Sequence, residues 1–448
     1  MELAIKIFQF ILSISILVVL HELGHFLPAK YFKTKVEKFY LFFDPYFSII
    51  KKKIGETEYG IGWLPFGGYV KIAGMVDESM DTEQLKQPAQ PWEFRAKPAW
   101  QRLIIMLGGV TVNFFLAWLI YGCLSFFNGE TSFDTTKVNA PMHYTNVAKA
   151  MGFQDGDEIL KVDGKVQNNL DKLALDVLLS DEITVKRNGK EETFATNDDG
   201  KAMAFKDENP KAFLTPRFSA IIDTIVNPKT MEAGLKIGDE IVSVNGEKIA
   251  YYDELQQAII KNPGKNINVD VIRAGAVEPL VLPVSADGTL GISSDKQMTK
   301  FYETKHFSFV ESIGRGFTRS IESLTYQVKQ FKLIFNRKVQ GYKKVGGPIA
   351  IINNMPVDKA SDGTVSVDWT AFWSFTAMFS VWLAFLNLIP IPGLDGGHVI
   401  FTLYEMIVGK PVPQKILENA QMVGVIFLLG LMLVIFGNDI VKIVMNKF

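Results

Sequence analysis

The chain has little cysteine, histidine or net charge, and each shortage excludes a class of protein. A single cysteine, Cys123, among 448 residues rules out an internal disulfide, and its apolar surroundings predict a small buried side chain. The formal net charge of -1 gives no support for nucleic-acid binding, so we expect no nucleic-acid partner. The five histidines leave few candidates for a metal site.

Hydrophobic residues are plentiful, at 48% of the chain, although 21% of the residues are charged. A soluble protein is rarely so apolar, and a bundle of membrane helices is rarely so charged. We therefore expect membrane segments at both ends with polar domains between them. Four apolar stretches are candidate membrane helices, at about 5–27, 103–127, 369–388 and 422–436. The last is shorter than the roughly 20 residues that span a bilayer, so its ends stay open.

Basic residues are concentrated between the first two apolar stretches, which bears on orientation. They are Lys30, Lys33, Lys35, Lys38, Lys51, Lys52, Lys53, Arg95, Lys97 and Arg102. The positive-inside rule then places this connecting segment in the cytoplasm, with both termini and residues 128–368 on the other side of the membrane. We expect no cleavable signal peptide, because a His-Glu pair stands where small residues would be needed for cleavage.

The first apolar stretch ends in His21-Glu22-Leu23-Gly24-His25. On a helix His21 and His25 face the same way, so their imidazoles can converge on one metal ion. Glu22 lies beside them and can accept a proton from a water molecule at that metal. Ionisable groups in a membrane segment are costly and usually functional. The motif therefore predicts a zinc protease that works inside the membrane.

A catalytic zinc usually has three protein ligands, so one more is needed. The third apolar stretch ends with two prolines and three glycines, which should break a helix at membrane depth. Asp395 in this break could supply an oxygen ligand, or it could cap the following helix. His398 is a rival ligand or a structural residue, and Asn387 could cap, bridge helices or hold a substrate backbone. His143 and His306 are interpreted as ordinary surface histidines.

Two further segments have regular patterns. Residues 49–73 alternate apolar residues with glycine pairs, which predicts a β-hairpin whose open edge is either plain surface or a partner for an extended substrate. From Phe309 to Phe335 apolar residues recur at helical spacing. This pattern predicts an amphipathic helix that lies on the membrane surface or packs against the preceding domain.

The long middle region contains a tandem repeat. Residues 151–164 match residues 233–246, with three glycines of each copy at the same offset. Each copy is interpreted as a glycine turn, a strand and an Asp-Gly or Asn-Gly hairpin turn. The pattern resembles PDZ domains, which bind extended peptides by strand addition. Peptide binding and a purely steric role both stay open for these copies.

Two motifs together carry a family resemblance: H-E-L-G-H at 21–25 and N-x-x-P-x-P-x-L-D-G at 387–396. They resemble the site-2 protease family of intramembrane zinc metalloproteases, and the tandem repeat is similar to that of its RseP (regulator of sigma-E protease) group. The resemblance covers nearly the whole chain, including residues 66–70 and the Gly-Pro-Ile at 347–349. Residues 108–113 depart from the usual A-G-P-x-x-N of the family.

The resemblance implies four membrane helices and one zinc ion (Zn2+) per chain, with His21, His25 and Asp395 as ligands and Glu22 as the base. It also implies a set of residues that hold an unwound substrate, namely Gly67, Gly68, Tyr69 and Asn387.

The implied substrates are single-pass membrane proteins: membrane-anchored regulators such as anti-sigma factors, and remnant signal peptides, cleaved in regulated intramembrane proteolysis. The implied location is the bacterial inner (cytoplasmic) membrane, with the PDZ-like pair on the extracytoplasmic side as a size filter. The alternatives are a non-catalytic PDZ-containing adaptor with a structural metal and a metal transporter. Glu22 argues against the adaptor, because a structural metal has no use for an adjacent acid.

We therefore expect a polytopic α-helical membrane protein with a cytoplasmic-side β-hairpin and two inserted PDZ-like α+β domains. The expected divisions are transmembrane helix 1 at 1–30, the cytoplasmic-side hairpin segment at 31–102, transmembrane helix 2 at 103–128, PDZ-like domains at 129–212 and 213–297, an amphipathic helix and linker at 298–368, transmembrane helix 3 at 369–395, and a short helix with transmembrane helix 4 at 396–448.

Overall fold

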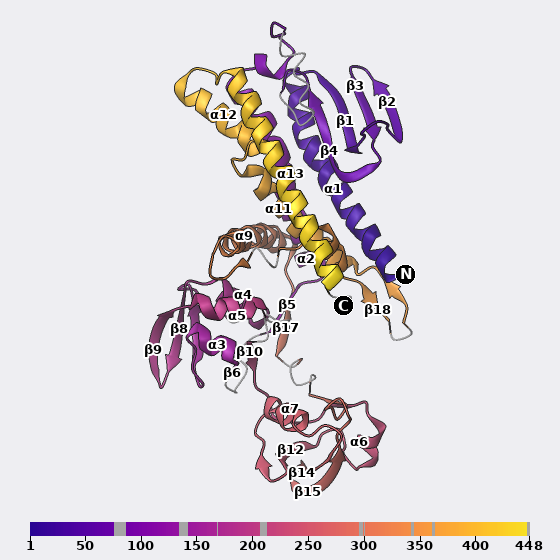
Figure 1. Ribbon diagram of the computed structural model, residues 1–448, viewed down its shortest axis with the longest axis vertical. Helices are drawn as coiled ribbons and strands as arrows, with labels where there is room; N and C mark the ends of the chain where they lie inside the picture. The colour runs from indigo at the N-terminus through magenta and orange to yellow at the C-terminus, as the bar shows by residue number, and fades with distance from the viewer. Residues whose placement is uncertain are drawn as a thin grey trace. The chain divides into compact units, whose positions relative to one another are not determined.

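The computed structural model (Figure 1) describes residues 1–75, 87–133, 142–167, 169–206, 213–294, 299, 301–341, 345–360 and 363–445. The expected domain boundaries at 212 and 297, and the last three residues, lie outside the described residues. The chain divides into two compact units. The first holds Met1–Gly129, His306–Lys329 and Lys344–Phe448, and the second holds Glu130–Lys305 and Gln330–Lys343.

Within the described residues, four helices of the first unit are long and apolar enough to cross a membrane. They are α1 (Glu2–Tyr31), α2 (Ala99–Phe127), α11 (Trp369–Leu388) and α13 (Gln414–Met445). The prediction of four membrane helices is confirmed. The ends of the last, which the sequence left open, lie at Gln414 and Met445, because α13 continues through polar residues such as Glu418 and Asp439.

The remaining helices of the first unit are short or amphipathic. They are η2 (Phe94–Ala96), α10 (Pro348–Asn353), α12 (Asp395–Val408) and α9 (Phe309–Ile334), whose residues from Gln330 on are assigned to the second unit. The helix predicted from the apolar spacing after residue 309 is therefore present as α9. Its Ile313 carbonyl accepts a hydrogen bond from the Trp118 indole of α2 at 2.8 Å, so the start of α9 lies against α2.

Cys123 lies on α2 and is exposed, so the prediction of a buried side chain was wrong. An apolar run gives the same signal for a side chain that faces lipid and for one that faces protein. In a membrane helix, exposure on the protein surface is compatible with an apolar residue.

A four-stranded sheet follows α1 in the first unit. Its strands are β1 (Val36–Phe43), β2 (Ile50–Ile54), β3 (Thr57–Ile61) and β4 (Leu64–Ile72), in the order β2-β3-β1-β4. The predicted hairpin is only partly right. β2 and β3 form a hairpin, whereas β4 pairs antiparallel with β1, a strand the sequence pattern did not single out. β4 is thus an edge strand of a mixed sheet.

The α13 helix is attached to α10 by a carboxylate inside the bundle. Asp439 is 2% exposed, and it accepts backbone hydrogen bonds from Gly347 (2.9 Å), Ile349 (3.1 Å) and Ala350 (3.2 Å). These are donors at the start of α10 that no helical carbonyl can satisfy. The Gly-Pro-Ile at 347–349 is therefore the docking point of the last membrane helix.

The second unit contains the two copies of the repeat. The first copy has α3 (Asn146–Met151), α4 (Leu170–Leu179), α5 (Asp198–Lys206) and a sheet of β7 (Glu158–Val162), β8 (Glu182–Arg187) and β9 (Lys190–Ala195). The second copy has α6 (Pro228–Glu232), α7 (Tyr252–Ile260) and a sheet in the order β13-β12-β14-β15, with β12 (Glu240–Val244), β13 (Glu247–Lys248), β14 (Asn266–Arg273) and β15 (Ala276–Pro283).

Short two-stranded pairings complete the sheets. They are β5 (Glu130–Phe133) with β17 (Tyr302–Lys305), β6 (Met142–Tyr144) with β10 (Leu214–Pro216), β11 (Thr224–Ile225) with β16 (Ile292–Ser293), and, in the first unit, β18 (Asp358–Lys359) with β19 (Val365–Ser366).

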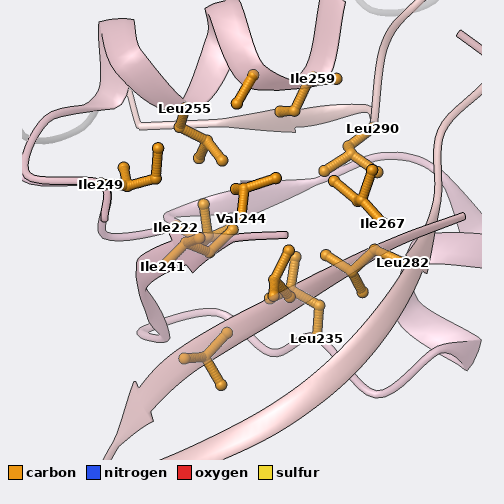
Figure 2. Packing of buried hydrophobic residues seen from close by; sticks show 14 of the residues in the cluster. Ile222, Leu235, Ile241, Val244, Ile249, Leu255, Ile259, Ile267, Leu282 and Leu290 are labelled. Carbon is orange, nitrogen blue, oxygen red and sulfur yellow. The ribbon is translucent and has the colours of Figure 1, made fainter. Parts of the chain in front are cut away.

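Each copy has its own hydrophobic core. In the second copy, buried aliphatic side chains of α7 point towards those of the sheet, as Figure 2 shows for Leu255 and Ile259 above Val244. The residues of that core labelled there are Ile222, Leu235, Ile241, Val244, Ile249, Leu255, Ile259, Ile267, Leu282 and Leu290. The separate cores indicate that each copy of the repeat is a small domain and that the two domains are built alike.

Each copy also contains an equivalent ion pair between an arginine and an aspartate. Arg187 bonds to both carboxylate oxygens of Asp157 at 2.8 Å, and Arg273 bonds to those of Asp239 at 2.8 and 2.6 Å. In each copy the same guanidinium also donates to the carbonyl of the glycine that opens the repeat motif. The aspartate of the repeated Gly-Asp-Glu thus forms a bidentate pair with a strand arginine, and this arginine ties the glycine turn to the strand.

Candidate metal centre

Three side chains meet where α1 faces the start of α12. His21 and His25 project from the same face of α1, with their Nε2 atoms 3.3 Å apart. The Oδ2 atom of Asp395 lies 3.3 Å from His21 Nε2 and 3.2 Å from His25 Nε2. The two histidines are only 7% and 4% exposed. The structure thus brings the three predicted ligands together, although Asp395 is far from the two histidines in the sequence.

This triangle fits a zinc ion. Two ligands of a tetrahedral zinc with bonds of about 2.0 Å are roughly 3.3 Å apart, which agrees with all three observed distances. Asp395 Oδ2 is buried, and although it lies close to both imidazoles, it makes no hydrogen bond of regular geometry within the described residues. Two imidazoles and one carboxylate form a donor set that leaves a fourth position open, which is typical of catalytic zinc.

The break after α11 places the carboxylate. α11 ends at Leu388, and Gly393 has a φ of +99°, a backbone conformation that favours glycine. The freed backbone N–H of Gly393 donates to Gln421 Oε1 on α13 at 3.1 Å. α12 then begins at Asp395, with Leu394 as its N-cap and no side-chain cap bond. Its first carboxylate faces the histidines and does not cap the helix.

A cavity of about 740 Å³ adjoins the triangle, and Glu22, Asn387 and His398 line it. The backbone N–H of Val70 on β4 hydrogen-bonds to the Glu22 carboxylate. The side-chain amide of Asn387 lies 3.2 Å from His21 Nε2. Residues of α1, β4, α11 and α12 therefore all line this cavity.

The substrate-holding residues expected on β4 also line this cavity, namely Gly67, Gly68 and Tyr69. Tyr69 stacks on Tyr40 with ring centroids 5.3 Å apart, and its hydroxyl donates to Asp44 at 2.9 Å. Burial, followed by this hydrogen bond to Asp44, raises the pKa of Tyr69. The phenol therefore stays neutral, so it donates to Asp44 and fixes β4.

The other two histidines lie elsewhere. His143 belongs to the second unit, where its Nδ1 lies 3.4 Å from Asp253, and His306 is exposed. Sequence reasoning missed Gln421 and Asn113, which are both buried in membrane helices. Their signal was a polar amide within an apolar run, because such groups are rarely placed in a membrane without a partner.

Comparison with known proteins agrees with this geometry. The family model described as peptidase family M50 matches residues 9–431. A Vibrio cholerae protein named "Putative zinc metalloprotease" is 29% identical, with 97% of this chain and 98% of the relative covered. The regulator of sigma-E protease RseP of Escherichia coli is 27% identical over 96% and 97% of the two chains. The regulator of sigma E protease of Haemophilus influenzae is 26% identical over 97% and 98%.

The resemblance to the site-2 protease family is therefore confirmed, and so are the zinc cofactor and the bacterial membrane location as a multi-pass protein. A non-catalytic adaptor is not favoured. With its helices, its His-His-Asp triangle and a family match over nearly its whole length, the chain belongs to peptidase family M50, the zinc metalloproteases of the site-2 type.

Proposed function

We propose that His21, His25 and Asp395 hold the zinc ion and that Glu22 is the general base for peptide hydrolysis within the membrane. The triangle of 3.2 to 3.3 Å on the face of a membrane helix is the observation that supports this proposal. Bound zinc lowers the pKa of a water molecule to roughly 7 and polarises the scissile carbonyl. Glu22 accepts the proton of the attacking water and later delivers it to the leaving amine.

The proposed substrates are membrane-spanning segments of single-pass proteins. Apolar side chains line much of the cavity beside Glu22, among them Val18, Met106 and Leu383. Such a lining fits an apolar segment better than a charged peptide. Two relatives are named regulators of sigma E, so we propose anti-sigma factors and remnant signal peptides as substrate classes.

A helical substrate hides its peptide bonds, so the enzyme has to hold it extended. We propose that β4 does so by strand addition, with Gly67, Gly68 and Tyr69 as the positioning segment. Successive residues of a strand direct their backbone groups to opposite edges, so residues two apart share an edge. Because Val70 directs its N–H to Glu22, Gly68 presents its backbone groups to the same edge. A substrate strand on that edge would run beside the metal position, with Asn387 on the other side.

Cleavage of a purified single-pass test protein in detergent is the test of this proposal. Mass spectrometry should find the new chain ends inside the apolar segment. Removal of the metal by 1,10-phenanthroline should stop cleavage, and added Zn2+ should restore it. Cleavage outside the apolar segment, or cleavage that persists without metal, would contradict the proposal.

The same assay tests substrate positioning. Asn387→Leu removes the amide that faces the cavity and keeps a side chain of similar size. We expect it to raise KM or lower kcat while the zinc content stays at that of the unchanged protein. Unaltered kinetics in this variant would remove Asn387 from the positioning set.

We further propose that the two copies of the repeat, within residues 129–212 and 213–297, are PDZ-like domains on the extracytoplasmic side. The basic residues of the segment at 31–102 support this orientation, because positive residues favour the cytoplasmic side. A protease added to spheroplasts should then cut the repeats and spare that segment.

For the PDZ-like pair we propose the role of a size filter that excludes untrimmed substrates. Deletion of residues 134–295 should then admit a test protein with a bulky extracytoplasmic domain, which the full chain leaves uncut. The measurement is the cleavage rate of matched trimmed and untrimmed substrates by both proteins. A fall in cleavage of the trimmed substrate would instead identify the pair as a substrate receptor.

A further inference from the structure

The α2 helix presents one face to the two histidines. Ile105, Gly109 and Asn113 are spaced four residues apart and share this face. The Ile105 carbonyl lies 2.8 Å from His25 Nδ1, and the Asn113 side-chain amide lies 3.2 Å from His21 Nδ1. Between them, a Cβ on Gly109 would lie 2.6 Å from His21 Cε1 and still closer to His25 Nε2. Both imidazoles thus rest directly on α2.

The two helices are held in this register by backbone contact. A Cβ at Gly24 would collide with the carbonyl of Gly108, and one at Gly108 would collide with that of Gly24. The Asn113 carbonyl also accepts a hydrogen bond from Ser380 of α11 at 2.7 Å. Asn113 is fully buried, so its amide has a fixed position against His21.

The position of the proton on the His21 ring decides whether the oxygen or the nitrogen of the Asn113 amide faces it. An imidazole that binds zinc through Nε2 carries its proton on Nδ1, and that N–H needs an acceptor. The Ile105 carbonyl is this acceptor for His25. With Nδ2 of Asn113 towards His21, two donors would face each other, and within the described residues Asn113 Oδ1 has no partner. Rotation of the amide by half a turn exchanges its two ends within the same volume.

We propose that Asn113 is a positioning residue: its amide oxygen accepts the Nδ1–H of His21 and so fixes the tautomer and ring orientation that present Nε2 to zinc. The inference rests on the proposed function, in which His21 is a zinc ligand. Together with the Ile105 carbonyl it makes α2 the helix that supports both metal-binding histidines. Asn113 touches neither substrate nor metal, so its effect reaches the reaction only through His21.

The test compares two substitutions of nearly equal size. Asn113→Leu has no acceptor, and we expect it to weaken the affinity for Zn2+ by about 10–100-fold, as is typical when such a partner of a zinc-binding histidine is lost. Asn113→Asp keeps an acceptor at the same distance, so its affinity should stay close to that of the unchanged protein. Affinity is measured on purified full-length protein by competition with a chromophoric chelator, and the visible spectrum with Co2+ reports the ligand geometry.

Two controls separate the possible failures. Ser380→Ala removes the hydrogen bond to the Asn113 backbone and leaves the amide in place, so it should keep the affinity for Zn2+. Equal loss in Ser380→Ala and Asn113→Leu, or equal loss in Asn113→Asp and Asn113→Leu, would overturn the acceptor role. An unchanged affinity in Asn113→Leu would overturn it as well. His21→Ala should lose zinc; an unchanged affinity there would overturn the ligand set of the proposed function itself.

Discussion

Replacement of Glu22 by glutamine should lower the rate of substrate cleavage by about 10²–10⁴-fold, the usual contribution of a general acid–base group. Glutamine has the shape of glutamate and can still accept the hydrogen bond from Val70, but it cannot hold the transferred proton. The ligand triangle does not include Glu22, so the variant should still bind one zinc ion per chain. The measurements are the cleavage rate of a membrane-anchored test substrate and the metal content of the same sample.

A matched control exists on the same helix. Glu2 is also a carboxylate of α1, but it pairs with Lys6 and Lys359 and does not line the cavity. Glu2→Gln should therefore cleave the substrate at a rate close to that of the unchanged enzyme. If Glu22→Gln retained that rate too, Glu22 would not be the base.

Asp395→Ala should remove most of the bound zinc and, with it, the activity. A site with two histidines keeps only two protein ligands, one fewer than catalytic zinc sites usually have. The carboxylate is also the only one of the three ligands that comes from outside α1. Metal analysis after dialysis against a weak chelator measures the loss.

Asparagine at the same position separates metal binding from helix capping. Asp395→Asn keeps a good capping side chain but removes the charge that attracts the metal. We expect zinc loss in this variant as well, whereas full metal occupancy would show that the carboxylate of Asp395 is not a zinc ligand. Asp439→Asn is the control, because Asp439 is also a buried carboxylate but, among the residues that the structure describes, it bonds to the start of α10 and not to the ligand triangle. It should lower the unfolding temperature and keep the zinc.

The parts of the fold that depend on local periodicity could be predicted from the sequence. The helical period alone places His21 and His25 on one face, and the length of an apolar run identifies a membrane helix. The prolines and glycines around Asp395 predict a break in the helix at membrane depth. For this reason the sequence could suggest the third ligand, although nothing local to Asp395 decided between metal binding and capping.

Pairings between distant segments could not be predicted in the same way. The alternation in β4 shows that it is a strand but does not say that β1 is its neighbour. A single apolar run could not tell that Cys123 faces outwards. The contact of Asn113 with His21 needs the register of two helices, and that register depends on the close approach of Gly24 and Gly108.

The distribution of the ligands between two regions of the chain has a mechanical consequence. Both imidazoles and the groups that support them belong to the helix pair α1 and α2, whereas the carboxylate belongs to the segment between α11 and α12. A bound zinc ion would consequently cross-link the first helix to a segment near the end of the chain. The cofactor would then stabilise the fold as well as take part in the reaction. Saturation with zinc should thus raise the resistance of the enzyme to heat, and depletion should loosen the very segment that carries Gly393.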